Sequence, residues 1–165
     1  MKLITTDFTE VKVYVEKESD LYDCFDPSED MISADVMSYI LDRYGEDALA
    51  KKARIVFVCG EDIDEERARA SFRRRVETLQ TVNRRERKVN RLDMTRLYVI
   101  GGIIVAAGII LKAFLDEFPM EIVSIVGTFA VWEATSILLT KNPRNTVAKK
   151  RLETLANAEL AFERK

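Results

Sequence analysis

Polar side chains inside a long apolar segment have spacings suited to contact with ions. They recur three, four and seven residues apart, at Glu121, Ser124, Thr128 and Thr135. Residues at these spacings share one face of an α-helix. Repeated around a symmetry axis, that face would form a mildly polar, pore-lining surface, with Glu121 attracting cations at its outer end. The alternative is that the hydroxyls bond to carbonyl groups of their own helix, which is common.

A second carboxylate, Glu133, lies deeper in the same segment and away from this stripe by helical angle. An ionised carboxylate that faced lipid at that depth would cost about 3 kcal/mol. We therefore expect Glu133 to be an intramembrane acid that faces protein or water, at a contact between helices rather than in the lining itself.

A run of cations precedes the apolar segment. Residues 67–96 contain 11 Lys/Arg against 3 Asp/Glu, whereas residues 1–66 contain 7 against 18. Because arginine favours bidentate contacts with phosphate, we treat ten of these cations as polyanion-binding candidates. Three partners stay open: the acidic first 66 residues, anionic membrane lipids, and a nucleotide or single-stranded oligonucleotide. The ten cations are Arg67, Arg69, Arg73, Arg74, Arg75, Arg84, Arg85, Arg87, Lys88 and Arg91.

Residues for catalysis or metal binding form no recognisable set. The chain has no histidine, and Cys24 and Cys59 are far apart in the sequence, which excludes a CxxC unit. It also lacks a phosphate-binding P-loop and a GxSxG nucleophile motif. The sequence therefore predicts a protein that is not an enzyme and has neither a cofactor nor a metal site.

Two adjacent apolar segments, 97–115 and 120–140, must position the polar stripe. Each is near the roughly 20 residues needed to cross a bilayer, so they predict a transmembrane hairpin. Positive residues flank both outer ends of the pair, and the four-residue turn has none. The positive-inside rule then places the protein in the inner (cytoplasmic) membrane with both termini in the cytoplasm.

The remaining chain predicts a mainly α membrane protein with a small cytosolic α/β head over residues 1–60. Alternating valines favour a strand over Thr9–Glu16, Ser33 can cap a helix that ends near Tyr44, and Arg54–Gly60 resembles a central strand. We expect a loop over 19–30 and a short helical piece over 46–52. A basic neck helix follows over 61–96. A cytosolic C-terminal helix is predicted within 141–165, after a break at Asn142-Pro143.

The neck helix also carries a narrow apolar seam. Its members recur at spacings of three, four and seven residues: Phe72, Val76, Leu79, Val82, Val89 and Leu92. A lone helix with such a seam needs a partner, and a second copy of the chain is the simplest one. Small residues from Gly101 to Gly108 would let another helix approach closely, either within the hairpin or between subunits.

The order of head, basic neck and two-span hairpin resembles the small membrane channel effectors of bacterial anti-phage systems, in particular those of the Hailong type. The resemblance implies an oligomeric pore opened by a nucleotide signal from a cytosolic signalling enzyme. The layout is also similar to the mitochondrial calcium uniporter. However, the turn here reads DEFPMEI and Trp132-Glu133 falls deep in the second span, so that activity is not implied.

From these patterns we expect a homo-oligomeric ion channel, most simply a tetramer, that acts as a nucleotide- or oligonucleotide-gated effector of anti-phage defence. The alternative is a membrane anchor or adaptor that does not conduct ions and recruits a cytosolic partner through its acidic head.

Overall fold

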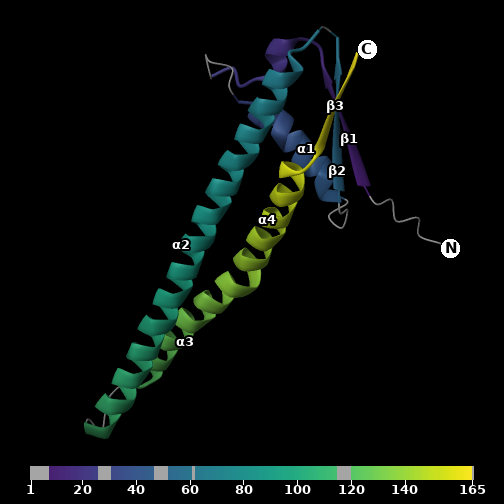
Figure 1. Ribbon diagram of the computed structural model, residues 1–165. Helices are drawn as coiled ribbons and strands as arrows, with labels where there is room; N and C mark the ends of the chain where they lie inside the picture. Colours follow the sequence, from purple (N-terminus) through teal and green to yellow (C-terminus); the bar gives the residue numbers. More distant parts are fainter. Residues whose placement is uncertain (1–7, 26–30, 47–51, 61, 115–119, 165) are drawn as a thin grey trace, which may run out of the picture. The chain divides into compact units, whose positions relative to one another are not determined.

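The computed structural model describes residues 8–25, 31–46, 52–60, 62–114 and 120–164 (Figure 1). It is mainly helical and includes a small sheet, as predicted. In chain order the elements are β1 (Phe8–Val15), a 3-10 turn (Glu18–Leu21), α1 (Ala34–Glu46), β2 (Lys52–Cys59), α2 (Glu65–Phe114), α3 (Met120–Ser136), a π turn (Ile137–Lys141), α4 (Asn142–Ala156) and β3 (Glu159–Arg164). Contacts divide the chain into a head unit, residues 1–82 and 148–165, and a hairpin unit, residues 83–147.

The head unit contains a parallel sheet in the order β1-β2-β3. As predicted from Arg54–Gly60, β2 is the central strand. Parallel neighbours need a crossover connection, and α1 supplies the one from β1 to β2. The connection from β2 to β3 contains α2, α3 and α4, so the whole hairpin unit is inserted into the second crossover.

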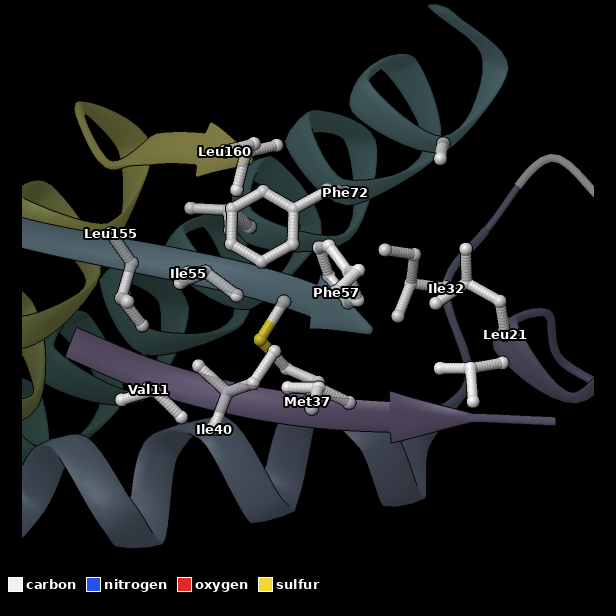
Figure 2. Packing of buried hydrophobic residues seen from close by; sticks show 14 of the residues in the cluster. Val11, Leu21, Ile32, Met37, Ile40, Ile55, Phe57, Phe72, Leu155 and Leu160 are labelled. Atoms are coloured by element: carbon white, nitrogen blue, oxygen red, sulfur yellow. The ribbon is translucent and has the colours of Figure 1, made fainter. Parts of the chain in front are cut away.

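One face of the sheet forms the core of the head unit. Figure 2 shows Val11, Ile55 and Phe57 of the sheet near Ile40 of α1 and Phe72 of α2. Ile40, Ile55 and Phe57 are fully buried, and all five side chains belong to one buried cluster. Burial of such side chains contributes about 1.5–3 kcal/mol each, so this cluster is the main source of the stability of the head.

The opposite face of the sheet is polar. Arg54 on β2 lies 3.8 Å from Glu10 on β1 and 4.0 Å from Glu159 on β3. Lys12 on β1 lies 3.8 Å from Glu163 on β3, so this ion pair crosses over β2. The aliphatic part of a lysine covers apolar surface in such an arrangement, which accounts for the burial of Val56 beneath it.

Local signals set the ends of several elements. The Ser33 hydroxyl accepts a hydrogen bond from the backbone N–H of Val36, and it caps α1 as predicted. The Asp64 carboxylate accepts one from the N–H of Arg67 and so caps α2. Gly60 ends β2 where an added Cβ would lie 2.9 Å from the carbonyl oxygen of Glu16, which leaves no room for a side chain.

The predicted neck and first apolar segment form one continuous helix, α2. Its first turns belong to the head: Phe72 and Val76 are buried in the cluster of Figure 2, and Leu79 packs against that cluster. The expectation that the whole seam meets another copy is therefore wrong for this half. Val82, Val89 and Leu92 remain about half exposed.

Two predictions about the C-terminal region are wrong. Pro143 does not break the helix, because it lies in the first turn of α4, where its missing N–H is tolerated. The π turn just before it widens the helix around Leu139, whose carbonyl Pro143 cannot bond. The predicted terminal helix ends at Ala156, and residues 159–164 form β3, in register with β2.

Three predicted segments fall wholly or partly outside the described residues. The turn between the apolar segments, most of the short helical piece at 46–52, and residues 26–30 of the acidic loop lie there. The described part of the loop contains the 3-10 turn, whose Leu21 is fully buried.

Candidate anion-binding groove and apolar helices

Within the hairpin unit, the second half of α2 and α3 pack together in antiparallel directions. Small residues make the closest contacts, since an added Cβ on Gly101 would lie 3.2 Å from the Cβ of Ala130. One on Gly108 would overlap Val123, and one on Gly127 would lie 2.6 Å from Val105. Of the two predicted uses of these glycines, contact within one chain is the one observed. Gly102, by contrast, has nothing within 4 Å of an added Cβ.

The outer surface of this pair is apolar and exposed. Phe129 and Trp132 of α3 are each 69% exposed, and Ile103 and Ile109 of α2 are exposed by 62% and 60%. The helix from Glu65 to Ala113 is long and apolar enough to cross a membrane, and only 11% of its most apolar stretch is buried. The core helix of a water-soluble protein would be mostly buried, so this exposure is compatible with a membrane-spanning helix.

The predicted pore-lining residues do not all have the same environment. Glu121 and Thr128 are exposed on α3, and the side chain of Ser124 lies outside the described part of the structure. Thr135 is half-buried. Its hydroxyl lies 3.2 Å from the Tyr98 hydroxyl of α2 and donates to the carbonyl of Val131 at 2.8 Å. At Thr135 the hydroxyl thus bonds to its own helix, as the second alternative expected, and it also contacts the partner helix of the hairpin; its role in a pore lining stays a prediction.

Glu133 is half-buried, one helical turn from the buried Ala130 and Ile137. Among the described residues, no cation or hydrogen-bond donor contacts its carboxylate. It thus lies at the border of the helix–helix contact, and its role as an intramembrane acid stays a prediction.

The cations nearest the start of α2 contact the head unit. The guanidinium of Arg67 lies over the ring of Tyr22 at 5.0 Å. That of Arg69 lies over Phe162 at 5.0 Å and pairs with Glu65 at 3.3 Å. Arg75 donates to the sulfur of Met31. Since their charged groups are already engaged, these arginines are poor candidates for a separate ligand.

Two titratable groups of the head respond to this packing. Burial, together with the negative charge of Glu18, raises the pKa of Tyr22 to about 12, while Arg67 opposes the shift. Burial, again with Glu18, raises the pKa of the Cys59 thiol. Both groups are therefore neutral at physiological pH, and the Cys59 thiol is weakly nucleophilic.

The cations further along α2 are arranged differently. Arg84, Arg87, Lys88 and Arg91 line one groove of about 430 Å³ in the hairpin unit, together with Asn90, Met94 and Ile137. None of these four cations pairs with a carboxylate in the described ranges of the chain. The remaining candidates, Arg73, Arg74 and Arg85, are exposed and outside this lining.

The groove combines four positive charges with an apolar end. Arg84 to Met94 span roughly 15 Å of helix at 1.5 Å per residue, and Met94 and Ile137 lie at the end nearest the apolar segment. Ile137 comes from the π turn, so the widened helix contributes to the wall. The cations were expected from the sequence, but Asn90, Met94 and Ile137 were not. Pro143 was the available signal for the π turn.

Comparisons with protein-family models, curated proteins and solved structures found no match.

Proposed function

We propose that this chain is a two-span membrane protein that assembles into a homo-oligomeric ion channel, most simply a tetramer. The observation that carries the proposal is the exposed apolar surface on both helices of the hairpin unit. In a bilayer, lipid tails and neighbouring subunits cover this surface, while the glycine contacts hold each hairpin together. Both termini then lie in the cytoplasm, because the flanking cations stay on the inner side.

Oligomerisation is supported by surfaces that the single chain leaves uncovered. Val82, Val89 and Leu92 continue the neck seam beyond the residues that pack into the buried cluster of the head, at a spacing that suits contact between parallel helices. In the apolar part of α2, Gly102 is open and Ala106 is exposed one turn further along. Small residues at this spacing let helices of neighbouring subunits approach closely.

The channel role is supported by the polar groups that remain exposed on α3. Glu121 and Thr128 are exposed, and Ser124 belongs to the same stripe, so these three form the proposed lining. Thr135 lies at its margin, because its hydroxyl is already bonded to Tyr98 and to the carbonyl of Val131. Glu133 would face a neighbouring subunit, where a hydrogen-bond donor would offset the free-energy cost of burying its carboxylate.

The control of opening is proposed to come from an anionic ligand on the neck, as the resemblance to anti-phage effectors implies. The support is the groove of Arg84, Arg87, Lys88 and Arg91, whose charges have no partner among the described residues. The connectivity provides a route for control from the head, since the hairpin unit joins the sheet through both α2 and α4.

The test is purification into lipid nanodiscs, subunit counting by mass measurement, and current recording in planar bilayers. We expect an oligomer whose conductance falls when Thr128 is replaced by Leu. Glu121→Gln should reduce cation selectivity. The matched control is Phe129→Leu on the adjacent exposed position, which should leave the current unchanged.

A monomer in nanodiscs would contradict the proposal. So would an oligomer that stays silent at every voltage and with every anionic ligand tried. The second outcome would favour the anchor or adaptor that recruits a cytosolic partner through the head.

A further inference from the structure

We infer that the groove lined by Arg84, Arg87, Lys88 and Arg91 binds the phosphate headgroup of an anionic phospholipid from the cytoplasmic leaflet. The inference rests on the membrane insertion proposed above, but it does not require that the protein conducts ions. It names the ligand class for the cations that the structure gathers together.

The position of the groove along α2 favours a lipid. The polar headgroup layer is roughly 5–7 Å thick on each side of the hydrocarbon core. With Leu97 at the edge of that core, Met94 lies about 5 Å and Arg91 about 9 Å above it, at 1.5 Å per residue. Long cationic side chains reach further towards the membrane along their aliphatic stems. The lower end of the groove, at Met94 and Arg91, therefore lies next to the lipid phosphates, while Arg87 and Arg84, about 15 Å and 20 Å above the core, continue the groove into the cytoplasm.

The chemistry of the wall also fits an amphipathic ligand. Met94 and Ile137 form the apolar end of the groove, which is the end nearest the apolar segment. The four cations line the rest of the groove, further from that segment along α2. An acyl chain and its glycerol would contact the apolar end, while the phosphate would contact two or more guanidinium groups. Arg87 and Asn90, which are half-buried, belong to the lining of the groove.

A nucleic acid fits this wall less well. Proteins that bind single strands stack the bases on aromatic rings, and no aromatic side chain is among the described lining residues. The apolar end at Met94 and Ile137 would also contact no part of a free polyanion. The observations therefore favour a lipid over the oligonucleotide expected from charge alone.

The test compares lipid retention by the full-length protein in nanodiscs, with native mass spectrometry of the extracted complex. The nanodiscs contain phosphatidylcholine alone or mixed with phosphatidylglycerol or cardiolipin. We expect the wild-type chain to retain the anionic lipids and not phosphatidylcholine. The double variant Arg87→Gln/Arg91→Gln should retain them at least tenfold less, because it removes guanidinium contacts to the phosphate, and one charge-assisted hydrogen bond is worth roughly tenfold in binding.

Two further variants identify the cause of a loss. Arg85→Gln/Arg96→Gln removes the same charge from the same stretch of α2 but outside the groove, so it should retain lipid normally. Arg87→Lys/Arg91→Lys keeps the charge and should retain lipid within a few-fold of wild type. Equal loss in the groove pair and the control pair would show diffuse attraction to the surface and overturn the inference.

Soluble probes distinguish the source of the phosphate. Glycerol 3-phosphate and a short single-stranded oligonucleotide should not displace the retained lipid. Binding of the oligonucleotide in the groove, lost in Arg87→Gln/Arg91→Gln while anionic lipid is ignored, would overturn the inference in favour of a nucleic acid. If the protein inserts into nanodiscs but retains no anionic lipid, only this inference fails. If it does not insert, the proposed function fails first.

Discussion

The head unit and the hairpin unit use apolar residues in opposite ways. In the head, large side chains such as Phe57 and Phe72 are almost fully buried between sheet and helices. In the hairpin unit, the small residues Gly101, Gly108 and Ala134 are buried, and large ones such as Phe129 and Trp132 are exposed. A water-soluble core excludes water from large side chains, whereas helices in lipid gain little from burying them and associate through close backbone contact. This is the contrast expected if the head unit lies in water and the hairpin unit in lipid, as proposed above.

The same substitution in both units tests this contrast most strongly. Phe57→Ala should destabilise the head by about 3–5 kcal/mol, because it removes a fully buried ring that stacks on Phe162 at 5.4 Å. Phe129→Ala, at an exposed ring on α3, should leave both units nearly unchanged in nanodiscs. Hydrogen exchange of the β2 and α3 backbones measures each effect. A large loss of protection in α3 would mean that Phe129 is buried against protein.

A pair of glycines tests the close contact within the hairpin. Gly108→Leu should destabilise the pairing of α2 and α3 by about 1–3 kcal/mol, because its Cβ would overlap Val123. Gly102→Leu should leave the pairing intact, since nothing lies within 4 Å of its Cβ. The melting temperature in detergent micelles compares the two. If Gly102→Leu instead dissociates an oligomer without lowering hairpin stability, it identifies a subunit contact at Gly102.

Removal of one hydroxyl tests the polar contact in the hairpin. Tyr98→Phe removes the partner of the Thr135 hydroxyl and should cost roughly 0.6 kcal/mol, the average for hydrogen bonds between helices in membranes. The cost is small because Thr135 keeps its bond to the carbonyl of Val131. Thermal stability in micelles measures it, with Tyr14→Phe on the exposed sheet face as the control.

A further effect is confined to the head and to alkaline pH. Because the fold raises the pKa of Tyr22 to about 12, it favours the neutral phenol. This contribution is fully present below about pH 10, the ordinary tyrosine pKa, and is lost as the pH rises through about 12. Unfolding of the wild type and of Tyr22→Phe between these pH values should therefore show a steeper decline in the wild type. Parallel curves would mean that the Tyr22 side chain ionises as freely in the fold as in the unfolded chain.

Local patterns in the sequence were sufficient to predict most individual helices and strands. Alternation at Val11, Val13 and Val15 predicted β1, the β-branched run from Arg54 predicted β2, and the Ser33 cap predicted the start of α1. These signals are local, because each depends on side chains a few residues apart. The cations of the groove were also readable, since they share one stretch of a single helix.

Hydrophobic periodicity gave the wrong prediction where contacts with a distant segment decided the secondary structure or the packing. Residues 159–164 have a mildly apolar pattern that also fits a helix, yet they form β3, because β2 offers an open edge and Phe57 offers a ring for Phe162. The first half of the neck seam packs into the head for a similar reason, since the sheet and α1 provide a larger apolar surface than the seam has alone.

The sequence by itself thus determined α1, the neck and the two apolar helical segments, the first two strands, and the separation of charged from apolar residues, all of which depend on neighbours along the chain. Only the tertiary structure decided which residues pack against one another. It buried Phe72 in the head, paired Gly108 with Val123, and brought Ile137 to the wall formed by Arg84 and Arg91. The physical reason is that burial and close packing depend on which surfaces meet, and residues far apart in sequence supply those surfaces.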